Sequence, residues 1–403
     1  MTEPLVDAIV VPTIRSAEHL HSAVKLAAHA RCHLIAVYTN KPPVGISAIV
    51  ERFPSARVTL LTVRRGTRDR LLDLGMSLPQ RDVSPAALDI SRKRNLGALI
   101  GRVCGWTRML MLDDDIRKLN VGKLCSAAAL LDHYPVVGLQ VKKYPDASVV
   151  GHARRLTGRR QEPFVSGGSL LVNPQLLKGY FAPVYHEDWL CVIDHLRNGE
   201  VAIGGSVGQW PYLPFTTPGR AKREEFGDIL LAGLLWLVHS RVGKNADITY
   251  PAADSEYWRE ATKSHFWAQI LEERVALIRE VATRLKEMNF ADPLPFLSLT
   301  AAEEQLSELE PAGFVSFIET WLASVAEWRK QLSLLPRVNL PDKARAIEKA
   351  IAKLSLAEIV RVHELPSLGV SIKQSGRIGG FAARWGRRTG TDGLRMFKMP
   401  DWF

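Results

Sequence analysis

The stretch Arg108-Met-Leu-Met-Leu-Asp113-Asp114-Asp115 joins an apolar run to three consecutive carboxylates. A short apolar run of this kind predicts a strand that is buried on both faces, as strands in parallel sheets are. Similar runs predict further strands at 8–12, 33–38 and 57–63. In such sheets ligands bind beyond the carboxyl ends of the strands, so the three aspartates are the first candidate site.

Helical patterns alternate with these strands. Apolar residues recur at three- and four-residue spacing over 16–30 and 86–104, which predicts amphipathic helices. Strands that alternate with helices indicate an α/β fold, in which a mostly parallel, Rossmann-like sheet is flanked by helices.

The strand signals stop after about residue 245, and the pattern beyond is mostly helical. We expect helices at 255–288, after a capping-box pair at Thr300 and Glu303, at 311–334 and at 342–363. The predicted organisation is an α/β domain at 1–245, a helical C-terminal region at 246–365 and a basic, glycine-rich tail at 366–403.

The composition is that of a globular protein. The chain has 403 residues, of which 46% are hydrophobic and 24% charged, and this excludes a disordered or fibrous class. The four cysteines form no C-x-x-C pair, so we expect no disulfide scaffold and a cytoplasmic location. The first residues carry acids in place of a basic segment, so we expect no signal peptide. The apolar stretch 229–238 is about half of the roughly 20 residues that span a bilayer.

The formal net charge of +11 is concentrated in two segments. Residues 142–160 hold six Lys/Arg and one acid, and residues 361–403 hold eight Lys/Arg and three acids. The pair Arg154-Arg155 suits bidentate contacts with phosphate groups, although this segment also fits a flexible surface loop. Basic residues among aromatic ones in the tail suit nucleic acid or an anionic membrane, or packing against an acidic face of the protein. We therefore expect an anionic partner, for which a phosphorylated small molecule and nucleic acid are both candidates.

The three aspartates repel one another unless a cation neutralises them. Carboxylate oxygens suit Mg²⁺ or Mn²⁺, which commonly bridge one or two carboxylates to a diphosphate. In an extended segment Asp113 and Asp115 point to the same side and Asp114 to the other, so Asp113 and Asp115 are the candidate metal ligands. The alternative is a solvated acidic turn that caps the following helix.

Four other motifs accompany the triplet along the chain. They are Val10-Val-Pro12-Thr13-Ile-Arg15, Ser91-Arg-Lys-Arg94-Asn95, Val165-Ser-Gly167-Gly168 and Tyr185-His186-Glu187-Asp188-Trp189. The order of all five over residues 5–215 resembles that of GT-A-fold glycosyltransferases, particularly the large family-2-like group. The resemblance implies a GT-A-like domain that moves a sugar from a nucleotide diphosphate sugar, with UDP as the default nucleotide, to an acceptor hydroxyl.

The resemblance also implies roles for individual residues. The implied nucleotide-sugar contacts are Pro12, Thr13, Arg15, Arg94, Asn95, Asp113 and Asp114. The candidate acceptor contacts are Gly167, Gly168, His186, Trp189, Arg154 and Arg155. The candidate ligands for Mn²⁺ or Mg²⁺ are Asp113, Asp115 and His186. Asp188, with Glu187 beside it, would take the proton from the acceptor in an inverting displacement, and a retaining route stays open.

These motifs also have structural interpretations. Arg94 fits a surface cation on a helix, and Gly167-Gly168 fits a tight turn with positive φ. Glu187 and Asp188 fit first-turn acids that the helix dipole favours. A histidine beside an aromatic residue is more often structural than a ligand.

Two segments near the last motif lead to the remaining expectations. No Q-x-x-R-W motif appears around 208–215, which speaks against a processive polysaccharide synthase. The charged segment 220–225 predicts a helix start with a solvated face, or a mobile loop that closes over the diphosphate.

Alternative functions are glycosyl transfer to nucleic acid such as a modified DNA base, nucleotidyl transfer, and non-catalytic binding of a nucleotide sugar. Nucleotidyl transfer ranks low because the loop after the first strand lacks a glycine-rich basic sequence.

Overall fold

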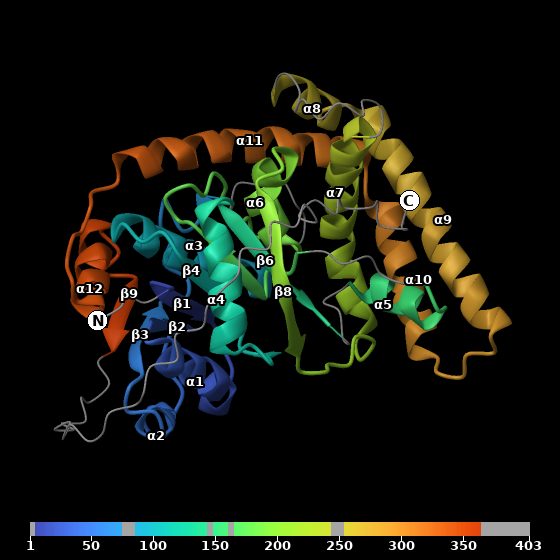
Figure 1. The fold of residues 1–403 in the computed structure, drawn as a ribbon. Helices are drawn as coiled ribbons and strands as arrows, with labels where there is room; N and C mark the ends of the chain where they lie inside the picture. The colour runs from blue at the N-terminus through green and yellow to red at the C-terminus, as the bar shows by residue number, and fades with distance from the viewer. Residues whose placement is uncertain (1–4, 75–84, 143–147, 160–164, 243–253, 364–403) are drawn as a thin grey trace, which may run out of the picture.

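A nine-stranded mixed sheet forms the centre of the computed structural model, which describes residues 5–74, 85–142, 148–159, 165–242 and 254–363 (Figure 1). The strand order is β5-β8-β6-β7-β4-β1-β2-β3-β9. The strands are β1 Ala8–Pro12, β2 His33–Thr39, β3 Arg57–Val63, β4 Met109–Leu112, β5 Ile116–Arg117, β6 Val136–Val141, β7 Ser169–Val172, β8 Val201–Gln209 and β9 Val360–His363. The predicted α/β class is confirmed.

The centre of the sheet is parallel, as the apolar runs predict. Strand β1 pairs in parallel with β2 and β4, and β2 pairs in parallel with β3. Strand β7 runs antiparallel to β4, with Ser169 opposite Leu112. The residues that precede β7 therefore meet the residues that follow β4, which places Gly167 and Gly168 beside the aspartate triplet.

Helices cover both faces of the sheet, and alternate strand residues face each layer. In β1, Ile9 and Val11 pack with α1 His21–Ala30, α2 Ile46–Glu51 and α4 Val121–Ala129. Ala8 and Val10 face the opposite core. Its helices include α3 Pro85–Val103, α5 Val149–Leu156, α6 Glu187–Arg197 and α7 Pro218–Val242. The predicted helix at 16–30 begins as a short 3-10 helix, Ala17–Leu20, before α1.

The C-terminal region is mostly helical, as predicted, and shares this second core. Its helices are α8 Asp254–Ala261, α9 Ser264–Glu287, α10 Leu294–Glu308, α11 Pro311–Leu334 and α12 Lys343–Lys353. Trp267 of α9 is fully buried and lies against Gly233 of α7, where an added Cβ would approach the indole ring to 2.5 Å. One apolar core therefore crosses the predicted boundary at residue 245, which itself lies outside the described residues.

Two helix predictions in this region are wrong. The capping-box pair Thr300 and Glu303 lies inside α10, which begins at Leu294 because Pro295 is tolerated in a first helical turn. The predicted helix at 342–363 ends at Lys353, and Val360–His363 form strand β9 antiparallel to β3. Helix α11 runs across the molecule and returns the chain to that edge of the sheet (Figure 1).

Among the described residues, no helix is both long enough and apolar enough to cross a membrane. The apolar stretch 229–238 is the buried core of α7. The basic tail beyond residue 363 lies outside the described residues, as do Lys143 and Arg160 of the basic 142–160 segment.

Candidate functional site

Four segments that are distant in sequence line one cavity of about 130 Å³. The lining residues are Ile90 and Arg94 of α3, Asp113 after β4, Gly167 and Gly168 before β7, and Tyr185, His186, Glu187 and Asp188 at the start of α6. The cavity lies at the carboxyl end of β4, where parallel sheets bind ligands. It brings together seven of the predicted site residues: Arg94, Asp113, Gly167, Gly168, His186, Glu187 and Asp188.

Arg94 joins two walls of this cavity. Its Nη2 atom donates to Asp113 Oδ1 at 2.7 Å, and its Nη1 atom donates to Glu187 Oε1 at 2.6 Å. The side chain is only 4% exposed, so the interpretation of Arg94 as a surface cation is wrong. Burial alone would lower its pKa, but the charges of Asp113 and Glu187 outweigh burial and raise it. Arg94 therefore stays charged and fixes both carboxylates.

Glu187 is the most perturbed carboxyl group of the cavity. Burial raises its pKa to about 7, against the opposing effect of Arg94, and the charge of Asp188 adds to the rise. A carboxyl group with a pKa near neutrality exchanges protons readily at that pH, which is a property of catalytic acids and bases. Glu187 and Asp188 also lie in the first turn of α6, so the structural interpretation of their position holds as well.

Asp188 is held by the glycine pair across the cavity. Its Oδ2 atom accepts a hydrogen bond from the backbone N–H of Gly167 at 2.6 Å. A Cβ on Gly167 would lie 2.3 Å from that oxygen, and a Cβ on Gly168 would lie 3.2 Å from Asp113 Oδ2. The two glycines do form a tight turn, in which the N–H of Ser169 donates to the carbonyl of Ser166 at 3.2 Å, but neither has the expected positive φ. Close approach to the two aspartates is what requires glycine here.

The other two aspartates of the triplet face a second arginine. Arg15, which follows β1, donates from Nη1 to Asp114 Oδ1 at 2.8 Å and lies 3.5 Å from Asp115 Oδ2. The hydroxyl of Thr13 donates to the other oxygen of Asp114. The side chain of Arg15 is 44% exposed, so this group faces solvent beside the cavity. The predicted contact residues Thr13, Arg15 and Asp114 thus form one cluster, and Pro12 ends the strand beneath it.

Asp115 has an environment that suits a cation. Burial raises its pKa, and repulsion from Asp113 raises it further. Its Oδ2 atom accepts a 3.3 Å hydrogen bond from Gln209, while its Oδ1 atom is buried with no hydrogen-bond partner among the described residues. A divalent cation near Asp113 and Asp115 would neutralise the repulsion between the two carboxylates and would give the buried Oδ1 atom a partner. The described residues contain no group of three or more His, Cys, Asp or Glu side chains arranged for a metal. A Mg²⁺ ion shared with a substrate diphosphate needs only one or two protein carboxylates.

His186 is fixed in an uncommon conformation at the wall of the cavity. It precedes α6 with φ 69° and ψ 34°, a left-handed conformation that non-glycine residues rarely adopt. Its Nε2 atom lies 2.8 Å from Asp228 Oδ1 in α7. Burial would raise the pKa of Asp228, but Arg274 and His186 hold it below its ordinary value. Asp228 occupies Nε2, so only Nδ1 of His186 could bind a metal, and the carboxylates that suit Mg²⁺ or Mn²⁺ at this site are those of Asp113 and Asp115.

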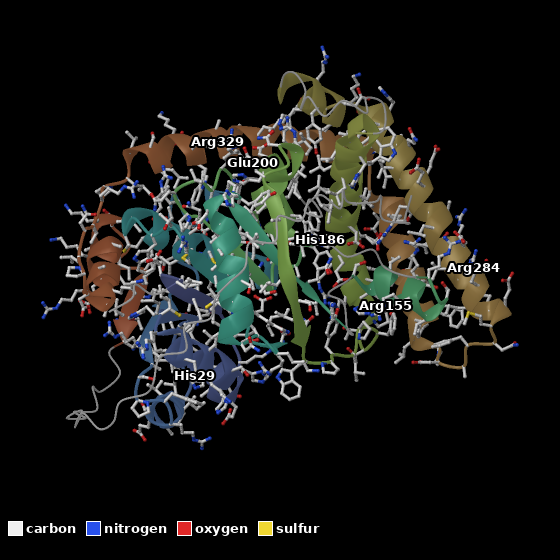
Figure 2. The ribbon with its side chains drawn as sticks, viewed as in Figure 1. His29, Arg155, His186, Glu200, Arg284 and Arg329 are labelled. Carbon is white, nitrogen blue, oxygen red and sulfur yellow. The ribbon has the colours of Figure 1, made fainter. Side chains whose placement is uncertain are left out.

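The remaining predicted contacts lie outside the lining of the cavity. Asn95 is buried and bonds both the N–H and the C=O of Phe181. Trp189 is 3% exposed and packs in the core. Arg154 is buried on α5, and Arg155 on the same helix lies toward α9 and α10, away from His186 (Figure 2).

Sequence reasoning missed the carboxylates of α7. The predicted solvated face of segment 220–225 is wrong, because Glu224 is 5% exposed and Glu225 is fully buried. Glu224 accepts from Arg220 Nε at 2.6 Å, and Glu225 pairs with Arg274 of α9. One sequence feature could have revealed them. These acids lie just before the apolar stretch 229–238 in the same predicted helix, so a helix that buries this stretch also buries charged residues.

The chain matches no known protein-family model and no curated protein at a significant level. The resemblance to GT-A-fold glycosyltransferases therefore rests on the motifs and on their order along the chain.

Proposed function

We propose that this protein is a glycosyltransferase that moves a sugar from a nucleotide diphosphate sugar to an acceptor hydroxyl, with inversion. The observation that carries the proposal is the cavity at the carboxyl end of β4, where Asp113, the glycine pair and Asp188 meet. The order of these motifs along the chain supports the same function, with UDP as the default nucleotide.

In the proposed reaction Asp188 is the general base. Its Oδ2 atom is held by the N–H of Gly167, which orients the carboxylate across the cavity from Asp113. The acceptor oxygen forms a bond to the anomeric carbon while the bond from that carbon to the diphosphate breaks. The acceptor proton passes to Asp188, and the electron pair of the breaking bond leaves with the diphosphate. A positioned base of this kind contributes roughly 10²- to 10⁴-fold to a rate.

Other residues prepare the donor side. Arg94 fixes Asp113 and Glu187 through its two Nη atoms, and Arg15 orders Asp114 and Asp115. Asp113 and Asp115 would hold Mn²⁺ or Mg²⁺, which when bound offsets charge on the leaving diphosphate. Thr13 and Arg15 follow β1 at the same edge of the sheet, and Arg15, which is 44% exposed, would contact the nucleotide portion.

The proposal includes a cytoplasmic location and an anionic acceptor. All four cysteines are free thiols in the structure, which supports a reducing compartment. The basic segments that suggest an anionic acceptor lie largely outside the described residues.

A thermal-shift screen of nucleoside diphosphates and their sugars, with and without Mn²⁺, tests donor binding. A ligand that binds the folded state raises the melting temperature by mass action. We expect one nucleotide to stabilise the protein, and Asp115→Ala to remove the part of the shift that depends on Mn²⁺. Chelation with EDTA would reverse the same part.

Transfer from the donor found in the screen tests the base. Asp188→Asn should keep the thermal shift but lose roughly 10²- to 10⁴-fold in kcat. Asp132→Asn is the matched control, because Asp132 is a 55% exposed aspartate that forms a surface ion pair with Arg108 and does not line the cavity. Unchanged transfer in both Asp115→Ala and Asp188→Asn would refute the proposed function.

A further inference from the structure

A chain of buried charged groups connects the cavity wall to the C-terminal helices. His186 Nε2 lies 2.8 Å from Asp228 Oδ1, and Asp228 Oδ2 accepts from Arg274 Nη2 at 2.5 Å. Arg274 also binds both oxygens of Glu225, with both distances 2.8 Å. Asp228 is 2% exposed, Glu225 is 0% exposed and Arg274 is 6% exposed. The outer member of this chain, Arg274, comes from α9, in the region beyond the predicted α/β domain.

Close packing fixes Asp228 relative to His186. Gly227 lies against the residue before His186, and a Cβ at Gly227 would be 2.3 Å from the carbonyl oxygen of Tyr185. Further along α7, a Cβ at Gly233 would lie 2.5 Å from the ring of Trp267 of α9. Helix α7 is therefore packed closely against both the segment before α6 and α9, and this packing preorganises the Asp228 carboxylate.

The hydrogen bond between His186 and Asp228 determines the tautomer of the His186 imidazole. A carboxylate accepts hydrogen bonds only, so the neutral ring of His186 carries its proton on Nε2 and has Nδ1 as its acceptor nitrogen. The ring plane is fixed at the same time, next to Glu187 and Asp188 in the cavity. Histidines that act on a substrate are commonly oriented by a carboxylate in this way.

We propose that Asp228, clamped by Arg274, is a positioning residue that fixes the tautomer and orientation of His186 on the acceptor side of the cavity. This inference rests on the proposed function for its catalytic consequence, but its structural claim stands without it. It makes α7 and α9 part of the active-site machinery, so that the C-terminal helices are required for transfer and for stability alike.

The variants Asp228→Asn and Asp228→Ala test the structural claim in the full-length protein. The Asn variant should fold, because Arg274 keeps its two bonds to Glu225. Ring nitrogen resonances of ¹⁵N-histidine-labelled protein report the tautomer, and His186→Gln assigns the signals. We expect a single Nε2–H tautomer in the parent protein and mixed or averaged signals in both Asp228 variants. Unchanged His186 signals in both variants would overturn the proposal, whatever the outcome of the donor screen.

The matched control is a second histidine–carboxylate pair, formed by His195 of α6 and Glu200, which follows the end of that helix. His195 Nδ1 lies 2.7 Å from Glu200 Oε2, and Glu200 lies toward α11 rather than beside His186 (Figure 2). With the donor and acceptor used for Asp188→Asn, we expect both Asp228 variants to lose roughly ten- to hundredfold in kcat while KM for the donor stays unchanged. The Asn variant should lose less than the Ala variant, and Glu200→Gln should match the parent protein. Equal kcat losses in Glu200→Gln and Asp228→Asn would show a merely structural effect and overturn the positioning role.

Discussion

Arg94 lines the cavity and also holds two of its carboxylates in place. It is the cation that the described structure places between Asp113 and Glu187, and its side chain is 4% exposed, while that of Asp113 is 27% and that of Glu187 is 13% exposed. A buried ion pair need not add net stability, because desolvation offsets its Coulomb energy. Removal of one partner is costly, however, because the others are left buried and charged.

Arg94→Met should therefore lower the free energy of unfolding by about 3–5 kcal/mol. The reason is that the carboxylates of Asp113, Glu187 and Asp188 then repel one another without a cation. Urea denaturation at constant pH measures the change. Arg15→Gln provides the comparison, since the half-exposed ion pairs of Arg15 should contribute at most about 1 kcal/mol. Equal losses in the two variants would contradict this account.

The buried glutamate Glu224 should make stability depend on pH. Burial raises its pKa from 4.5 to about 7, against the opposing effect of Arg220. Between these values the folded chain binds more protons than the unfolded chain, so this contribution to stability is present below about pH 4.5 and is lost as the pH rises through about 7. Glu224→Gln should remove that loss, so that the stability difference between the parent and the variant changes by roughly 1–3 kcal/mol from pH 5 to pH 8. Denaturant titrations at both pH values measure it, and an unchanged difference would contradict the direction of the pKa shift.

Much of the cavity could be predicted from the order of the motifs along the chain. Asp113, Gly167 and Asp188 each also had a structural interpretation, and it was the order of the five motifs that favoured a common site. The partners of these residues could not be predicted in the same way. Arg94 was compatible with a surface position, and Asp228 lies 42 positions from His186, so no local pattern connects them.

At the scale of elements, the contact between the segment that precedes β7 and the start of α6 depends on the absence of a side chain at Gly167. Gly167→Ala would force a Cβ to within 2.3 Å of Asp188 Oδ2. We expect a loss of about 1–3 kcal/mol from overpacking and at least a tenfold loss of transfer, because the Asp188 carboxylate must move. Gly122→Ala in α4 is the control: its Cβ would meet only Asn120 Oδ1, at 3.5 Å, and alanine favours the helix by about 1 kcal/mol. Thermal melts and transfer rates of the two variants check the prediction, which fails if Gly167→Ala retains full activity.

The elements themselves were predictable where burial dominates the pattern. The continuous apolar runs of β1, β2, β3 and β4 identify strands buried on both faces. Strand β9 was not predictable, because four residues with Val360 and Val362 beside Arg361 and His363 fit a helix end equally well. Its pairing with β3 is decided by tertiary structure.

At the scale of the whole molecule, the α/β part and the C-terminal helices should unfold together. Trp267 is fully buried, stacks on Phe314 with ring centroids 4.9 Å apart, and belongs to the core that also contains Val10 of β1. Trp267→Ala should cost about 3–5 kcal/mol. Hydrogen exchange followed by mass spectrometry should then show an equal loss of protection in peptides from β1 and α9. Met288→Ala, at a 54% exposed position, should leave both unchanged. Loss of protection confined to α9 would show two independent units.

The apolar core shared by the α/β part and the C-terminal helices could not be predicted from the sequence. A change from alternating strands and helices to helices alone is typical of a domain boundary, and it occurs near residue 245. The pattern does not show that α7 buries charged groups against α9, because the pairing of Glu225 with Arg274 spans 49 positions. Only the folded structure places these residues together.

The antiparallel pairing of β9 with β3 has a consequence for synthesis of the protein on the ribosome. Leu60 pairs with His363, so the edge of β3 has no strand to cover it until nearly the whole described chain has been translated. An open strand edge pairs readily with other chains, and closure of so long a loop is slow. Nascent chains that stall before residue 360 should therefore depend on chaperones, because the sheet is completed only after β9 has been synthesised.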